Sequence, residues 1–467
     1  MNIVLIVNDT LRADHLGCYG YFRSTSPTMD RLAEEGVLFE DFYASGINTG
    51  TAFTGIHTGL YPIHHKVYSV APSDLILDDI PTLAETLRDS GYTTAAFDNL
   101  AFCRSWSQDP VHFHKGFEHY IGDVWSAKYT KDDWACSEAR QGEWYNARMI
   151  PWIENHTDEK FFIFVHYWDV HQPYSQPEAY RKLFRHKKGD LSDLQVKQAK
   201  AGYSYVQGWG AVGQMYEDYG FVPGKVPPGK VPRREASIDL YDGSIAYVDR
   251  CIQDVVDTLA RKGILEDTLI VVSSDHGELL GEHGVYIHST LYESNIRVPL
   301  IMRYPAALPQ GKRIQGLAGH VDILPTVLDL AGVKDRPDSD GLSLLLLLDG
   351  GKPREELVSE NAGGVRALRR GDYKFIYVYQ DGGAELYNVK ADPMELMNLV
   401  EAEKEKAGIL KQGLESWAEV MLGETAEDPI QYVVKNYDYR KVTERFPMDR
   451  YGGGFVYQDI DKPDWSG

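Results

Sequence analysis

Residues 268–278 read Thr-Leu-Ile-Val-Val-Ser-Ser-Asp-His-Gly-Glu, and this stretch decides the fold. Its first five residues form a β-rich run without alternation, which is typical of a strand buried on both faces of a parallel sheet. Asp275 and His276 follow at the carboxyl end, where open α/β sheets bind their ligands. We expect this pair to bind metal or move protons. An Asp that caps the next helix beside a surface His is the alternative for the dipeptide alone.

Three other apolar runs, at residues 3–7, 93–97 and 161–165, also end in polar residues. Helical patterns lie between these runs, at residues 27–35, 81–90 and 242–262. The first two helical patterns begin with Pro and are followed by Gly, and the third carries an apolar stripe at helical spacing. Strands that alternate with helices predict an α/β fold with a mainly parallel sheet.

The alternating pattern breaks down twice along the chain. Residues of about 180–236 are basic, then aromatic and rich in Gly and Pro, and we interpret them as a lid, an oligomer contact or a plain surface excursion. After residue 341, short strands are expected at 365–368, 374–378 and 385–387, followed by a helix over about 393–420. We therefore predict a catalytic domain over 1–355 and a small-sheet subdomain with an aromatic tail over 356–467.

The composition excludes some classes of function. A net charge of -21 argues against a nucleic-acid partner, and an acidic protein needs a local positive source such as metal ions to bind an anion. The absence of a long apolar run predicts no membrane span, and the first residues run directly into a strand without a leader pattern. The four cysteines lack CxxC spacing, which favours reduced thiols and a cytoplasmic protein.

Residues of the metal-ligand type gather at the predicted strand ends. Asp9 follows the first strand, and Asp169 and His171 follow the third. The i, i+2 spacing of the latter two would place both on one side if strand geometry persists. His288 lies on the loop after residues 268–278. Taken alone, each residue could be a helix cap, a turn former or a histidine with satisfied hydrogen bonds. Four such clusters at four strand ends instead favour one shared site.

Residues 48–62 contain several hydroxyls and small residues in a stretch with helical character. If Thr49 begins this helix, its Oγ and the Gly50 amide can face an anion, because free N–H groups and the helix dipole favour negative charge there. A threonine hydroxyl is a poor nucleophile unless a base or a metal lowers its pKa. Alternatively, Thr49 is only an N-cap.

The chain resembles the sulfatase family of the alkaline phosphatase superfamily. The motifs that carry the resemblance lie at residues 9–16, 18–20, 58–62, 171–174, 241–245, 274–278, 297–301, 322–326 and 385–388. It implies an alkaline phosphatase-like/sulfatase fold, in which helices sandwich a large, mainly parallel sheet and a small C-terminal antiparallel-sheet subdomain follows. It also implies a metal-centred site at the carboxyl edge of the large sheet.

Several site positions depart from the family pattern. Sulfatases of this family carry Cys or Ser at the start of a Cys-x-Pro-x-Arg motif, where oxidation yields formylglycine. This chain has Thr49 at that position, Thr51 at the Pro position and Phe53 at the Arg position. The usual catalytic Lys and His of a Gly-Lys-Trp-His segment are missing, Thr10 replaces a metal-binding Asp, and His288 replaces a Lys.

These departures resemble the threonine-nucleophile branches of the superfamily, the nucleotide pyrophosphatase/phosphodiesterases and the phosphoethanolamine transferases. The resemblance implies two divalent metal ions, with Zn or Mn favoured and Ca or Mg possible. The first ion would be held by Asp9, Thr49, Asp275 and His276, and the second by Asp169, His171 and His288. The catalytic residues would be Thr49, Gly50 and Asn99, with Asn99 and His171 binding the substrate.

We therefore expect a metal-dependent hydrolase that cleaves phosphate diesters or phosphonate monoesters through a metal-bound Thr49. Its substrate would be a small anionic ester, and the chain could form a homo-oligomer. One alternative is a sulfuric ester hydrolase (sulfatase) that works without formylglycine. A second alternative is a non-catalytic relative that binds a ligand or partner.

Overall fold

An eight-stranded sheet forms the centre of the computed structural model, which describes residues 1–68, 79–100, 113–122, 141–172, 174, 176–184, 234–284, 286–288, 290–361, 364–423 and 427–431. Across the sheet the strands are β10 (Lys312–Gly319), β2 (Val37–Tyr43), β9 (Leu300–Arg303), β6 (Thr268–Ser274), β1 (Asn2–Asn8), β5 (Phe161–Tyr167), β3 (Thr93–Phe97) and β4 (His119–Ile121). All neighbours are parallel except the two pairs that involve β9. The predicted α/β fold with a mainly parallel sheet is confirmed.

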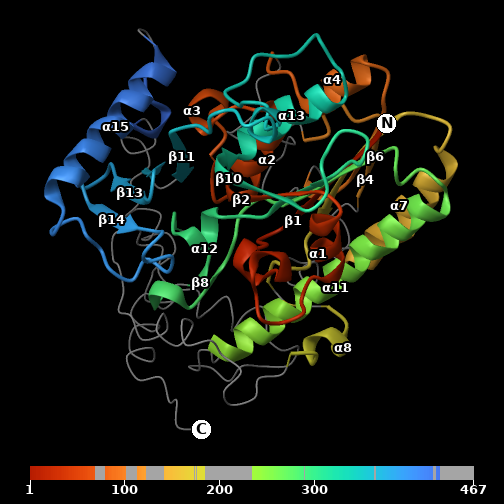
Figure 1. Cartoon of the computed structure of the whole chain (residues 1–467), viewed down its shortest axis with the longest axis horizontal. Coiled ribbons are helices and arrows are strands. Elements are labelled where there is room, and N and C mark those ends of the chain that lie inside the picture. Colours follow the sequence, from red (N-terminus) through yellow and green to blue (C-terminus); the bar gives the residue numbers. More distant parts are fainter. Residues whose placement is uncertain are drawn as a thin grey trace, which may run out of the picture.

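Helices cover both faces of this sheet (Figure 1). One face carries α2 (Thr49–Thr58), α4 (Leu83–Asp89) and α13 (Ile323–Leu330), and the other carries α1 (Pro27–Glu34), α7 (Gly142–Asn155) and α11 (Arg234–Arg261). Side chains of β5 contact the helices of both layers, because successive side chains of a strand point to opposite faces of the sheet. The Phe164 ring meets Phe53 of α2, whereas the Tyr167 hydroxyl donates to Asn146 of α7.

A four-stranded antiparallel sheet forms the C-terminal subdomain, with α15 (Lys404–Leu422) packed on it. Its strands are β11 (Glu356–Asn361), β12 (Val365–Arg370), β13 (Tyr373–Val378) and β14 (Ala384–Asn388). The last three confirm the strands predicted at 365–368, 374–378 and 385–387. Leu368, Phe375 and Leu386 pack with Leu410 and Leu414 of α15 to form the small core.

The predicted helix over 393–420 begins later than expected, at Lys404. Glu395 has a φ of 55°, in the left-handed region that no helix interior uses. Its buried carboxylate accepts a 2.7 Å hydrogen bond from the Glu293 amide and pairs with Lys374 Nζ at 2.5 Å. The segment before α15 is therefore a turn that ties the subdomain to the large domain.

Shorter elements complete the described part of the chain. They are α3 (Pro62–His65), α8 (Glu178–Arg181), α12 (Glu293–Ile296), α14 (Leu345–Leu348) and the two-stranded ribbon β7 (Leu279–Leu280) with β8 (Tyr286–Ile287). Most of the predicted insertion at 180–236 and most of the aromatic tail lie outside the described residues. Cys18 and Cys251 are free thiols. No helix within the described ranges is both long and apolar enough to cross a membrane.

Candidate functional site

The register of β1 and β5 brings Asp9 and His166 to the same face of the sheet. Val7 pairs with His166 in this parallel ladder. Because side chains two residues apart on a strand share a face, Asp9 points to the side of Val7 and therefore of His166. The distance from His166 Nε2 to Asp9 Oδ2 is 3.5 Å. Asp9, directly after β1, and His166, the penultimate residue of β5, thus build the centre of the site.

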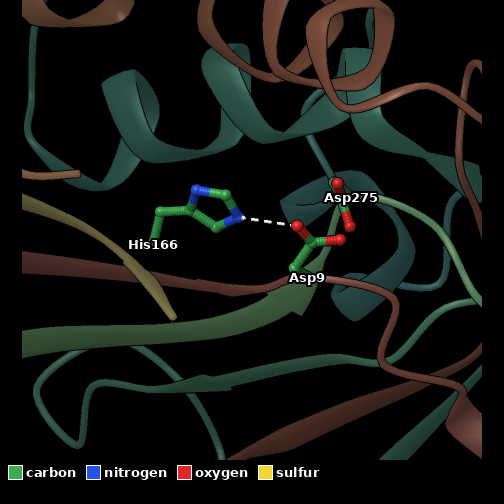
Figure 2. A group of neighbouring side chains, drawn as sticks. All are labelled: Asp9, His166 and Asp275. Carbon is green, nitrogen blue, oxygen red and sulfur yellow. Dashed lines mark ion pairs between the residues drawn. The ribbon is translucent and has the colours of Figure 1, made fainter. Parts of the chain in front are cut away.

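The neighbouring strands extend this centre into a row across the carboxyl edge. Asp275 directly follows β6, whose Ser274 pairs with Asn8, and it lies beside Asp9 (Figure 2). On the other side, Asp98 directly follows β3, and its Oδ1 lies 2.8 Å from His166 Nδ1. We call these four residues the strand-end row: Asp98, His166, Asp9 and Asp275.

Three members of the strand-end row converge closely enough to share one ion. Asp9, His166 and Asp275 each offer a ligand atom, and these atoms lie within 4.8 Å of one another. All three side chains are fully buried. Among the residues that the structure describes, neither oxygen of Asp9 nor Oδ2 of Asp275 has a hydrogen-bond partner. Buried carboxylates without partners are costly, so the donor set fits a divalent cation.

The pKa shifts within the strand-end row also favour a bound cation. Burial raises the pKa of Asp9, but His171, His166 and His276 outweigh burial and hold the pKa well below its usual value. Burial and the neighbouring Asp9 raise the pKa of Asp275 to about 7. Burial lowers the pKa of His166, yet Asp9 and Asp98 together raise it to about 9. A cation would relieve the repulsion between the two carboxylates and displace the His166 proton.

The histidines around the row have the hydrogen-bonding pattern of metal ligands. Nδ1 of His276 lies 3.1 Å from the Gly277 carbonyl oxygen, and its Nε2 lies 3.2 Å from Asp275 Oδ2. Burial and the nearby His288 lower the pKa of His276, which keeps the ring neutral. Nδ1 of His171 likewise bonds to the Gln172 carbonyl. Ligating histidines usually donate one ring N–H in this way, which leaves the lone pair on the other nitrogen.

His166 was not among the predicted site residues. It lies inside β5 and is enclosed by apolar neighbours, where a histidine is more often a satisfied core residue. The signal in the sequence is its position just after the run at residues 161–165, directly before the polar segment that contains Asp169 and His171. Only the pairing of Val7 with His166 shows which way its side chain points.

Helix α2 begins at Thr49, as predicted, and Asn48 rather than Thr49 caps it. The ring of His57 meets Phe164 at 4.7 Å between centroids, and the ring of Phe53 meets His166 at the same separation. The amino end of α2 therefore points toward the carboxyl edge of the sheet. Since residues four apart on a helix share a face, Thr49 lies one turn beyond Phe53 on the side of the strand-end row.

The Gly50 amide has a partner in this structure. It donates a 3.1 Å hydrogen bond to Asn48 Oδ1, the capping interaction of α2. Gly50 was predicted to present this amide to an anion. An incoming anion would have to replace the Asn48 side chain at this amide.

Asp169 and His171 do not continue the strand. Strand β5 ends at Tyr167 and a turn follows, so the strand geometry that would have placed both side chains on one side does not persist. The charge of Asp169 acts on Tyr247 and Cys251 of α11, behind the sheet. His171 instead acts on Asp9 and His276. His171 is therefore near the row, and Asp169 lies within electrostatic range of α11.

The two remaining predicted residues border the row. The His288 ring stacks on His276, with 4.2 Å between centroids, and meets the His171 ring edge-on at 5.1 Å. Asn99 is fully buried and directly follows Asp98 of the row. Both residues are therefore placed at the carboxyl edge, as expected.

The family comparisons are consistent with a site at this edge. The sequence matches the family model Sulfatase over residues 1–333, and the model N-sulphoglucosamine sulphohydrolase, C-terminal, over residues 281–419. A choline-sulfatase of Rhizobium meliloti is 26% identical over 423 residues, which cover 80% of this chain and 78% of that protein.

Solved structures share the fold. A phosphonate monoester hydrolase of Agrobacterium radiobacter superposes with a TM-score of 0.69 at 22% identity, covering 89% of this chain and 95% of that one. A structure solved in complex with its substrate D-glucosamine-2-N,6-O-disulfate gives a TM-score of 0.71 at 22% identity, covering 94% and 98%. The matched Sulfatase model spans every residue of the strand-end row, and the chain therefore belongs to the sulfatase family of ester hydrolases in the alkaline phosphatase superfamily.

Proposed function

We propose that this chain hydrolyses phosphate diesters or phosphonate monoesters and that Thr49 is the nucleophile. The proposal depends on the direction of α2. Its amino end, where Thr49 lies, points toward the carboxyl edge of the sheet that holds the strand-end row. By the resemblance to the sulfatase motif, Thr49 takes the position at which the family's sulfatases carry the Cys or Ser that becomes formylglycine. A threonine at this position favours direct attack by a hydroxyl over chemistry through an aldehyde hydrate.

Thr49 would act in two displacement steps. Its Oγ forms a bond to phosphorus while the bond from phosphorus to the leaving oxygen breaks, and the Thr49 proton is released. Water then cleaves the phosphothreonine ester and restores the hydroxyl. Asp9 and Asp275, with His166 or His276 beside them, would hold a divalent cation, and such a cation would supply a Lewis acid that lowers the pKa of the Thr49 hydroxyl and neutralises charge on the phosphoryl oxygens.

Other residues of this chain would orient the phosphoryl group. Asn99, buried at the end of β3, can donate its amide N–H to a nonbridging oxygen. The Gly50 N–H can do the same once the substrate oxygen replaces Asn48 Oδ1. His171, whose charge acts on both Asp9 and His276, would contact the substrate beside the row.

Sulfate ester hydrolysis without formylglycine is the second candidate function. The similarity to the choline-sulfatase favours it, and both candidates use the same strand-end row. In that case Thr49 would form its bond to sulfur, and the expected leaving group would be an alcohol or a phenol. The missing catalytic Lys and His argue for the phosphoryl substrate instead.

Initial rates on four esters with the same 4-nitrophenyl leaving group separate the two candidates. The substrates are a sulfate, a phosphate monoester, a phosphate diester and a phosphonate monoester, each assayed with the Zn²⁺- or Mn²⁺-loaded protein. We expect kcat/KM for the diester or the phosphonate to exceed that for the sulfate by roughly 100-fold or more. A sulfate rate above all the others would contradict the proposal and support the second candidate.

A further inference from the structure

We propose that Lys374 of the C-terminal subdomain is a positioning residue for the loop that carries Asp275 and His276, and that it acts through α12. We call residues 275–278, which directly follow β6, the site loop. Lys374 lies on β13 of the small sheet, so the proposal gives the subdomain a part in ester hydrolysis. The inference rests on the proposed function only in that some ester is hydrolysed at the strand-end row, and it holds for both candidate substrates.

Helix α12 packs directly against the backbone of the site loop. The Gly277 amide donates a 2.7 Å hydrogen bond to the Asn295 carbonyl oxygen. A Cβ atom at Gly277 would lie 2.0 Å from the Ser294 carbonyl oxygen, so no side chain fits between the loop and the helix. Nδ1 of His276 lies 3.1 Å from the Gly277 carbonyl oxygen. The position of α12 therefore sets the position of the peptide group that orients His276.

Lys374 binds the amino end of α12 from the small sheet. Its side chain is fully buried, and its ammonium group donates a 2.8 Å hydrogen bond to the Leu291 carbonyl oxygen. The same group pairs with Glu293 Oε1 at 3.1 Å and with Glu395 Oε1 at 2.5 Å. The other oxygen of Glu395 accepts a 2.7 Å hydrogen bond from the Glu293 amide. Lys374 and Glu395 thus fix both the side chain and the backbone of Glu293, the first residue of α12.

Asn295 connects the contact with Lys374 to the contact with the site loop. Its side-chain amide donates to the carbonyl and hydroxyl oxygens of Thr290, both at 3.1 Å, while its backbone carbonyl accepts from Gly277. Asn295 and Thr290 are both buried, and Leu291, the acceptor of Lys374, directly follows Thr290. A continuous path of hydrogen bonds therefore leads from the small sheet to the site loop, and an element held in this way keeps a site in its productive geometry.

The competing explanation is that Lys374 only joins the two domains. Loss of a buried cation is destabilising in any case, because it leaves carboxylates without their counter-charge. Arg303 is the matched control for that effect, since it is 5% exposed, pairs with Glu35 at 2.9 Å and Glu266 at 2.5 Å, and donates to the Leu265 carbonyl oxygen at 3.0 Å. It ends β9, which runs antiparallel to β6, and so lies toward the start of β6, away from the site loop.

Steady-state kinetics on the full chain test the proposal. Lys374→Met and Arg303→Met are assayed on the 4-nitrophenyl ester that the wild type hydrolyses fastest, at a temperature at which circular dichroism shows all three proteins to be folded. We expect Lys374→Met to lower kcat by roughly 10- to 100-fold with KM nearly unchanged, because a displaced site loop loses contacts that are made in the transition state. Arg303→Met should melt at a lower temperature than the wild type but keep kcat within about twofold.

The dissociation constant of Zn²⁺, measured by isothermal titration calorimetry on the same metal-free proteins, is the second readout. It should rise by roughly tenfold in Lys374→Met, because contacts outside the ligands orient the ligands themselves. It should stay near the wild-type value in Arg303→Met. If Lys374→Met does not fold, Lys374→Met/Glu395→Gln removes one charge of each sign and is expected to show the same changes.

Each outcome decides a separate question. A folded Lys374 variant with wild-type kcat and wild-type Zn²⁺ affinity would overturn the positioning role. Equal losses in Arg303→Met would also overturn it, because they would show that instability alone produces the effect. A wild type that hydrolyses none of the esters would reject the proposed function, and the Zn²⁺ affinities would then decide the role of Lys374 by themselves.

Discussion

Replacing Thr49 by alanine is expected to lower kcat on a phosphate diester by roughly 10³-fold or more, because the nucleophile of a covalent route has no substitute. The melting temperature and the metal content should stay close to wild type, since Thr49 occupies the first turn of α2, which Asn48 caps. The measurement is steady-state kinetics together with zinc analysis of the same samples. Thr49→Ser should retain much of the activity because it keeps a hydroxyl at the same position.

Thr54→Ala is the matched control for this change. Thr54 lies on the same helix and is fully buried, and its hydroxyl donates to the Gly50 carbonyl at 2.7 Å. Its loss should cost about 1 kcal/mol of unfolding free energy and little activity. Residual activity of Thr49→Ala above about a tenth of wild type would remove Thr49 from the role of nucleophile.

Asp275→Asn is expected to abolish the stabilisation that a divalent cation gives the wild type. In the metal-free protein, Asp275 is buried beside the ionised Asp9, so its neutralisation costs little stability and can raise it. Zn²⁺ at 100 times its dissociation constant should stabilise the wild type by about 2.7 kcal/mol, and the variant by far less. Thermal unfolding with chelator and with Zn²⁺ gives both values.

Asp249→Asn controls for the loss of a buried carboxylate as such. Asp249 accepts hydrogen bonds from the Thr28 and Met29 amides at the start of α1, away from the strand-end row. The Asp249→Asn protein should unfold at a lower temperature than the wild type but should be stabilised by Zn²⁺ to the same extent. An Asp275→Asn protein that gains as much from Zn²⁺ as the wild type would exclude Asp275 as a ligand.

The sequence predicted the sheet and two strand-end carboxylates because these depend on local patterns. Asp9 and Asp275 follow apolar runs, and the carboxyl ends of parallel strands meet at one edge. The sequence did not identify His166 as a site residue, because the direction of its side chain depends on the pairing of β1 with β5. No local pattern reveals that pairing. Asp169 was grouped with His171 by assuming that strand geometry continues, whereas β5 ends at Tyr167.

Tertiary contacts explain the other differences. The helix predicted from residue 393 starts at Lys404 because Glu395 adopts a left-handed backbone and pairs with Lys374. Glu278 was visible in the sequence, three residues after Asp275, but its burial and its 3.6 Å ion pair with His288 are properties of the folded chain. Thus the pattern of strands and helices predicted where the site would be, and packing decided which side chains enter it.

Capture of the covalent intermediate tests the role of Thr49 most directly. The metal-loaded protein is mixed with a phosphate diester or a phosphonate monoester, quenched in acid within the first turnovers and digested for tandem mass spectrometry. We predict a phosphoryl or phosphonyl group on the peptide that contains residues 48–62, localised to Thr49 and absent from Thr49→Ala. A modified residue other than Thr49, or turnover through a pre-steady-state burst with Thr49 unmodified, would contradict this account.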